Sequence, residues 1–231
     1  MDEFASTRCV VFDLDDTLWP CEPTITHAEN ALYEWLQIHY PKITQCYSAD
    51  QLRAHRVEFA QSNPQLSHDV TALRKASLAS IAEEFSYPAA LADEGLAWFR
   101  KYRNRVELYP DSLSTIVELV NSYQTGVITN GNADVEAIGL GKYFDFIVTA
   151  EVAGAAKPDR EIFEYARAIT GLENHELLYV GDHPELDIVG ASNSGWKTVW
   201  FNLNKKTWPE VSIRPDAEIQ NISELLNILS I

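Results

Sequence analysis

The chain has 231 residues, and its 46% hydrophobic content allows a sizeable core, either in one large domain or beside a smaller attached module. Its net charge of −16, with no run of five like charges, argues against nucleic acid and anionic membranes as partners. The acidic start "MDEFASTRC" is unlike a signal peptide, and no apolar segment approaches about 18 residues. The three cysteines are odd in number and lack metal-type spacing, which indicates a reduced intracellular setting, so together these features predict a cytoplasmic protein. We expect either a monomer or a small homo-oligomer.

The first predicted element is a buried strand, the apolar run Cys9–Phe12, which ends in a cluster of aspartates. Asp13, Asp15 and Asp16 occupy three of the next four positions. Buried carboxylates are costly unless a cation or hydrogen bonds compensate them. The cluster therefore requires a compensating partner.

The stretch from about residue 22 to 105 is predicted to be helical. One helix face is outlined by residues at i, i+3, i+4 and i+7 spacing: Leu32, Trp35, Leu36 and His39. The helical pattern ends at "ELYPDS", the clearest boundary signal in the chain. We therefore predict a helical insertion, residues 20–106, within a core formed by residues 1–19 and 107–231.

Beyond that boundary, strands and helices are predicted to alternate. The segments expected to be extended are "TGVIT", "FDFIVTA", "ELLYVGD" and "KTVWF". The segments expected to be helical are "SLSTIVELV", "VEAIGLG", "REIFEYARAIT", "IVGASNSG" and "ISELLNIL". Such alternation is typical of a parallel sheet covered on both faces. The predicted fold class is α/β, a doubly wound parallel sheet with an inserted helical domain.

Polar residues follow the predicted strands of the core. At the strand ends, or in the loops after them, lie Asp13, Asp15, Thr129, Lys157, Asp182 and Asp187. In open parallel sheets, ligands bind beyond the carboxyl ends of the strands. We therefore expect carboxylates from separate strands, one lysine and one threonine to converge on a single edge of the sheet.

The expected cluster indicates a particular chemistry. Several carboxylates gathered together indicate a bound cation, and an all-oxygen ligand set suits Mg²⁺ better than zinc. A cation beside an ammonium and a hydroxyl favours a phosphoryl group, whose transfer mainly requires charge stabilisation and alignment. One aspartate can act as the nucleophile, and a second carboxylate two residues away can serve as general acid and then base. Asp13 and Asp15 have that spacing.

Four short motifs, in order, resemble those of the haloacid dehalogenase-like superfamily. They are "DLDDT" at 13–17, "ITNG" at 128–131, "KPD" at 157–159 and "GDHPELD" at 181–187. A single short motif is a weak signal, whereas four in order at strand ends are not expected by chance. The helical insertion lies where that superfamily has a type C1 cap, so the resemblance implies a Rossmann-like core with a cap domain.

The resemblance also implies a phosphatase that acts on a small phosphorylated metabolite through an aspartyl-phosphate. Asp13 would be the nucleophile and Asp15 the general acid and base. Thr129 would hydrogen-bond the transferring phosphoryl group, helped by the backbone after it. Lys157 would offset the negative charge of Asp13 and of the phosphoryl oxygens.

A magnesium ion is part of the same implied site. The resemblance assigns as its ligands the Asp13 carboxylate, the Asp15 main-chain carbonyl and the Asp182 carboxylate. Asp187 is expected to support these ligands rather than to bind the ion directly.

Within the superfamily, "FDLDDTL", "ITNGNA", "GLGKYFDF" and the "HDVT" that precedes Arg74 resemble the bacterial flavin mononucleotide phosphatase group. Members of that group also dephosphorylate the ribitylaminouracil phosphate of riboflavin synthesis. Substrate binding is then expected from Asn130 and Gly131 in the core and from Arg74 in the cap, although Arg74 could equally pair with a neighbouring acid. Flavin mononucleotide or a related ribityl or nucleotide phosphate is the substrate class that the resemblance favours.

Three other functions remain compatible with these motifs. A phosphomutase would use the same core residues, but it needs a cap that keeps the phosphorylated intermediate from water. A haloacid dehalogenase is less favoured, because dehalogenation does not need the acid/base residue Asp15. A non-catalytic binding protein would be expected to have lost a site residue, and none is missing.

Overall fold

The computed structural model describes residues 4–209 and 213–231, so the first three residues of the predicted core and residues 210–212 lie outside the described residues. The chain divides into two compact units. The core unit comprises Met1–Pro20, Glu107–Gly131 and Val135–Ile231. The helical unit comprises Cys21–Val106 and Asn132–Asp134.

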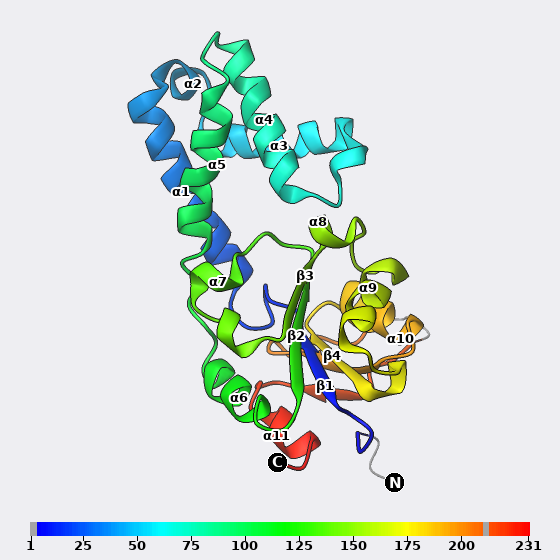
Figure 1. Cartoon of the computed structure of the whole chain (residues 1–231). Helices are drawn as coiled ribbons and strands as arrows, with labels where there is room; N and C mark the ends of the chain where they lie inside the picture. Colours follow the sequence, from blue (N-terminus) through cyan, green and yellow to red (C-terminus); the bar gives the residue numbers. More distant parts are fainter. Residues whose placement is uncertain (1–3, 210–212) are drawn as a thin grey trace. The chain divides into compact units, whose positions relative to one another are not determined.

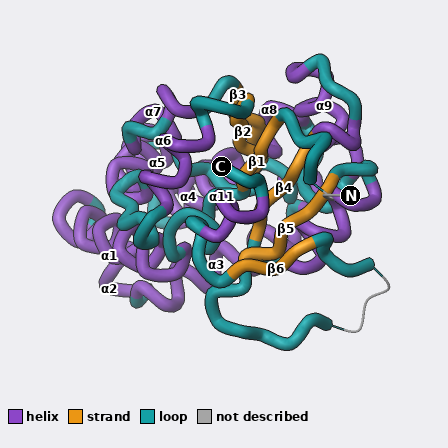
Figure 2. The backbone as a smooth tube through the Cα atoms, turned by 90° about the horizontal axis from the view of Figure 1, so that it is seen from below, coloured by secondary structure: helices purple, strands orange, loops and turns teal. Residues whose placement is uncertain are grey.

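In the described part of the chain, the core unit contains one sheet of six parallel strands in the order β3-β2-β1-β4-β5-β6. The strands are β1 (Cys9–Phe12), β2 (Gln124–Thr129), β3 (Phe146–Thr149), β4 (Leu177–Gly181), β5 (Lys197–Phe201) and β6 (Ala217–Ile219). Figure 2 shows them side by side. Because the chain builds outward from β1 on both sides, the sheet is doubly wound, and the predicted fold class is confirmed.

Strand β1 occupies the middle of the sheet because all four of its side chains are apolar. Each of its residues is fully buried. Phe12, its last residue, lies opposite Val127 of β2 and Val180 of β4. A run without polar positions suits only a strand with neighbours on both sides and helices on both faces.

Helices cover both faces of this sheet (Figure 1). The helices of the core unit are α6 (Ser112–Leu119), α7 (Val135–Ile138), α8 (Ala150–Ala153), α9 (Arg160–Thr170), α10 (Gly190–Asn193) and α11 (Glu224–Ile228), with a π-helical turn at Pro184–Val189 and 3₁₀ turns at Gly141–Tyr143 and Asn174–Glu176. Helices α9 and α10 pack on the face that carries Val11 and Tyr179, where Phe163 joins a buried apolar cluster. Helices α6 and α11 lie on the opposite face (Figure 1).

The helical unit has an apolar core of its own. Its helices are α1 (Cys21–His39), α2 (Pro41–Cys46), α3 (Ala49–Ser62), α4 (Val70–Glu84) and α5 (Ala90–Arg103), with a 3₁₀ turn at Pro64–Leu66. Trp35, Leu78 and Phe99 belong to one buried cluster that joins α1, α4 and α5. Asp134 also groups with this unit, and its N–H donates to Asn104 Oδ1 (3.0 Å). None of the helices in the described ranges is long and apolar enough to cross a membrane.

Candidate active site

Asp13 directly follows β1, and the sheet holds its backbone in place. Its N–H donates to the carbonyl oxygen of Val180 (2.9 Å), so the ladder between β1 and β4 continues into the site. The residue is only 7% exposed. Burial raises the pKa of the Asp13 carboxyl well above its usual range; the ammonium of Lys157 opposes this effect and the carboxylate of Asp187 adds to it.

Lys157 joins residues that come from separate strand ends. Its Nζ donates to Asp13 Oδ1 (2.7 Å), Asp187 Oδ1 (2.6 Å) and the Tyr179 hydroxyl (2.8 Å). An ammonium has three donors, so all of them are used. Burial by itself would lower the pKa of Lys157, but the two carboxylates outweigh it and raise that pKa above its usual value. The lysine is therefore a fixed positive charge in the buried site.

The loop that carries Lys157 is tied to the end of β2. The Lys157 N–H donates to Asn130 Oδ1 (2.8 Å), and Asn130 Nδ2 donates to the Lys157 carbonyl oxygen (2.9 Å). Beside them, Oγ1 of the buried Thr129 accepts a hydrogen bond from the Gly131 N–H (2.9 Å). The Asn130 side chain thus positions Lys157, while substrate binding by Asn130 and Gly131 stays a prediction.

Asp187 is fully buried beside the end of β4. Its Oδ1 accepts from Lys157 and its Oδ2 accepts from the His183 N–H (2.8 Å). Gly181 makes room for it, because a Cβ at that position would overlap the Asp187 side chain. These contacts hold the Asp187 carboxylate in place, while its supporting role at a metal ion stays a prediction.

Asp182 lies at the carboxyl end of β4, next to the other two carboxylates. Oxygens of Asp13, Asp182 and Asp187 all lie within 4.8 Å of one another. Burial, followed by the charges of Asp187 and Asp16, raises the pKa of Asp182 to about 7. When all three groups are ionised, they carry more negative charge than Lys157 compensates, so their ionised state favours a bound cation.

The donor set of this group fits magnesium. Carboxylate oxygens are ligands of hard cations such as Mg²⁺, and neither a thiolate nor an imidazole is among the grouped atoms. A divalent cation would also oppose the burial and the charge repulsion that together raise the pKa of Asp13 and of Asp182. Among the residues described, Asp13 and Asp182 are the pair best suited to hold the ion, while Asp187 is occupied by hydrogen bonds.

Asp15 lies in the turn that follows β1, and its side chain is anchored by a buried indole. Trp19 Nε1 donates to Asp15 Oδ1 (2.9 Å), and the Asp16 N–H donates to the Trp19 carbonyl oxygen (2.7 Å). Asp16 has a φ of 60°, in the left-handed region that aspartate tolerates. The turn therefore fixes the Asp15 carboxylate, while coordination by its main-chain carbonyl stays a prediction.

Two aromatic residues of the site were not predicted from the sequence. The Tyr179 hydroxyl donates to the Ile128 carbonyl oxygen (2.9 Å) and accepts from Lys157, and Trp200 Nε1 donates to the Asp182 carbonyl oxygen (2.8 Å). The sequence could have indicated them, because a tyrosine or tryptophan within a buried strand needs a hydrogen-bond partner for its polar atom. Which partner it finds depends on strand order.

Arg74 belongs to the helical unit, where it pairs with an acid. Its Nη2 lies 2.9 Å from Glu29 Oε1. Arg74 therefore pairs with a neighbouring acid, which was one of the two roles that the sequence allowed. The two roles do not exclude each other, and substrate binding by Arg74 stays a prediction.

We expect Mg²⁺ to raise the melting temperature more at pH 8 than at pH 5.5. The folded-state pKa of Asp182, about 7, lies above the ordinary value of 3.8, so without metal stability is lost as the pH rises between these values. A cation binds the ionised carboxylate and reverses that loss. Thermal melts with and without Mg²⁺ test this, with Asp182→Asn as the control that has no carboxylate to titrate. An equal stabilisation of the wild type at both pH values would contradict the assignment.

A family model and several known proteins are similar to this chain. A family model described as haloacid dehalogenase-like hydrolase matches residues 7–195. The 5-amino-6-(5-phospho-D-ribitylamino)uracil phosphatase YigB of Escherichia coli is 28% identical to the chain over 95% of both proteins.

Two solved structures resemble the whole chain. A crystal structure of a 2-haloacid dehalogenase from Pseudomonas syringae pv. tomato is 37% identical, with a TM-score of 0.91 over 97% of this chain and 98% of that one. The magnesium-bound HAD-hydrolase YfnB of Bacillus subtilis is 22% identical, with a TM-score of 0.71 over 97% of this chain and 99% of its own. Because YfnB is only 22% identical to this chain, its similarity shows the fold alone.

Proposed function

This chain belongs to the haloacid dehalogenase-like hydrolase family, and from that premise we propose that it is a Mg²⁺-dependent phosphatase of small phosphorylated metabolites. The observation that carries the proposal is the convergence of Asp13, Lys157 and Asp182 at one edge of the parallel sheet. A buried nucleophile, a fixed positive charge and a cation site are the parts that phosphoryl transfer requires. The similarity to a named phosphatase over 95% of both chains adds support.

In the proposed reaction, the Asp13 carboxylate attacks phosphorus. A bond forms between Asp13 and phosphorus while the ester P–O bond breaks, and Asp15 donates its proton to the departing oxygen. Asp15 then removes a proton from water, which attacks the aspartyl-phosphate, releases inorganic phosphate and restores Asp13. The anchored carboxylate of Asp15, two residues beyond the nucleophile, suits this double role.

Charge stabilisation is divided among this chain's own groups and the ion. Lys157 offsets the charge of Asp13 through the 2.7 Å hydrogen bond. The Thr129 hydroxyl would donate a hydrogen bond to a phosphoryl oxygen. When bound by Asp13 and Asp182, with the Asp15 carbonyl as a further ligand, Mg²⁺ would supply additional positive charge at the phosphoryl oxygens.

The similarity to a named relative supports the proposed substrate class. YigB is named for a phosphate ester of a ribitylaminouracil, and we extend that substrate class to this chain. Together with the resemblance of the sequence motifs, this similarity supports flavin mononucleotide, or a related ribityl or nucleotide phosphate, as the proposed substrate. The match covers both units of the chain, including the helical unit that would select the leaving group as a cap.

A second candidate function is haloacid dehalogenation, which the likeness to the Pseudomonas syringae enzyme favours. That reaction also uses a carboxylate nucleophile, but a halide leaves without needing a proton. It therefore gives no role to Asp15 as a general acid or to a cation held by Asp182. Asp15 is present in this chain, and Asp182 belongs to a group of three carboxylates that could hold a cation, so phosphate ester hydrolysis remains the preferred function.

We expect the purified chain to release phosphate only when Mg²⁺ is present. The test uses a panel of p-nitrophenyl phosphate, flavin mononucleotide, nucleotides and sugar phosphates, with 2-chloropropionate assayed in parallel for chloride release. Removal of the metal with a chelator should abolish phosphate release, and readdition of Mg²⁺ should restore it. Metal-independent chloride release without phosphate release would establish the dehalogenase instead, and isomerisation of a sugar phosphate without hydrolysis would favour a mutase.

A further inference from the structure

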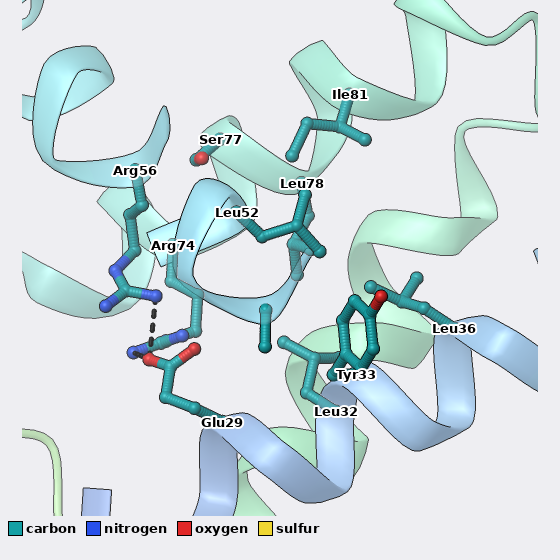
Figure 3. Close-up of a pocket in the computed structure, with 11 residues that line it drawn as sticks. Glu29, Leu32, Tyr33, Leu36, Leu52, Arg56, Arg74, Ser77, Leu78 and Ile81 are labelled. Atoms are coloured by element: carbon teal, nitrogen blue, oxygen red, sulfur yellow. Dashed lines mark ion pairs between the residues drawn. The ribbon is translucent and has the colours of Figure 1, made fainter. Parts of the chain in front are cut away.

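The helical unit has a cavity of its own, lined by side chains from α1, α3 and α4 (Figure 3). Its volume is about 30 Å³. One water needs roughly 10–15 Å³ on this measure, so the cavity has room for a group of about two water molecules in size. Part of the wall is apolar and includes Leu32, Leu52 and Leu78.

The polar part of the wall carries more positive than negative charge. Glu29 Oε1 lies 2.7 Å from Arg56 Nη1 and 2.9 Å from Arg74 Nη2. Burial opposes ionisation of Glu29, but the two guanidinium groups outweigh it and lower the pKa of the carboxyl. Two guanidinium groups therefore face one carboxylate, and one positive charge is left without a counter-ion in this cluster.

Arg74 also retains hydrogen-bonding capacity. Its side chain is 9% exposed, and its Nε and Nη1 are buried without a hydrogen-bond partner among the described residues. The guanidinium carbon lies 3.4 Å from the centre of the Phe99 ring, so stacking holds the group in place. Buried donors are nearly always paired, and unpaired donors on a fixed cation lining a cavity therefore point to an anionic acceptor.

We propose that this cavity binds a carboxylate group, with Arg74 and Arg56 as its ligands and the leucine side chains in contact with an attached alkyl group. A carboxylate is planar and matches the fork of a guanidinium, and its single negative charge matches the surplus of the cluster. The small volume also favours a carboxylate over a bulkier phosphate. The site lies wholly within the helical unit and does not depend on the proposed phosphatase activity.

Saturation-transfer NMR on the full chain tests the proposal with acetate as the probe. Acetate should bind, whereas acetamide, its neutral counterpart, should not. Arg74→Met should weaken acetate binding at least about tenfold, because hydrogen bonds to a charged group are lost. Glu29→Gln should strengthen binding, because the competing carboxylate is removed.

The matched control is Lys75→Met, which removes a positive charge from the next residue of α4. Lys75 pairs with Asp93 at the exposed surface and does not line the cavity. This variant should bind acetate as the wild type does. If Arg74→Met fails to fold, Arg56→Met takes its place, because Arg56 is more exposed and its loss should be better tolerated.

The carboxylate could belong to a substrate or to a separate small metabolite, and kinetics distinguish the two. If it belongs to the substrate, acetate should compete with 2-phosphoglycolate in the wild type and leave the hydrolysis of ethyl phosphate by the wild type unchanged. If it is separate, acetate should change the hydrolysis of both esters in the wild type and in neither with Arg74→Met. Failure of acetate to bind the wild type, or equal binding by wild type and Arg74→Met, overturns the proposal whether or not the chain is a phosphatase.

Discussion

Replacement of Asp13 by asparagine is expected to lower Mg²⁺-dependent release of phosphate from p-nitrophenyl phosphate by at least about a thousandfold. Asparagine keeps the shape of the side chain, and its Oδ1 can still accept the hydrogen bond from Lys157. A neutral amide oxygen, however, is a much poorer nucleophile than a carboxylate towards phosphorus. The reaction would therefore lose its first bond-forming step while the fold is preserved. Initial rates and a thermal melt of the same preparation measure the two effects separately.

Asp159→Asn provides the matched control for this experiment. Asp159 is exposed and precedes α9, and its side chain makes no capping hydrogen bond. The control should retain wild-type activity. Full activity of a folded Asp13→Asn protein would eliminate Asp13 as the nucleophile, and another carboxylate of the cluster would have to take its place.

Replacement of Lys157 by methionine is expected to destabilise the protein by about 3–5 kcal/mol, because it removes one partner of a buried ion pair. The carboxylates of Asp13 and Asp187, 2.7 and 2.6 Å from Nζ, would then face each other without a compensating charge. The Tyr179 hydroxyl would lose its donor as well. Phosphatase activity should fall with stability, since Lys157 also offsets charge on the phosphoryl group. Urea denaturation and initial rates at pH 7 test both expectations.

The destabilisation should depend on pH in a defined direction. Without the lysine, nothing opposes the burial that raises the pKa of the Asp13 carboxyl, so the variant should lose stability as the pH rises and recover part of it at pH 5. Lys142→Met removes an exposed lysine and should change stability by no more than about 0.5 kcal/mol. A Lys157→Met protein as stable as this control would show that Lys157 does not compensate the buried carboxylates.

The α/β core could be predicted from the sequence, because the patterns that indicate its strands and helices each lie within a short stretch of the chain. The apolar run Cys9–Phe12 indicated a buried strand, and alternating strand and helix patterns indicated a parallel sheet. The short edge strand β6 was missed, because the three residues Ala217–Ile219 have no distinctive pattern. Pairing with β5 is what makes them a strand.

The superfamily was also accessible, because its motifs are short stretches of contiguous residues at strand ends. The family match over residues 7–195 confirms that recognition. The assignment of Asp13, Asp15, Thr129, Lys157 and Asp182 to individual catalytic roles stays a prediction, and the substitutions above are its tests.

The sequence by itself therefore determined the fold class, the family and the strand ends where the polar residues gather, because each depends on neighbouring residues in the chain. Only the tertiary structure decided the partners of those residues. Lys157 meets Asp13 across 144 positions, and it meets Tyr179 across 22. The pairing of Arg74 with Glu29, which leaves donors free in the helical unit, was decided in the same way. Such contacts depend on strand order, register and helix packing, which bring together side chains whose separation in sequence carries no signal of their proximity.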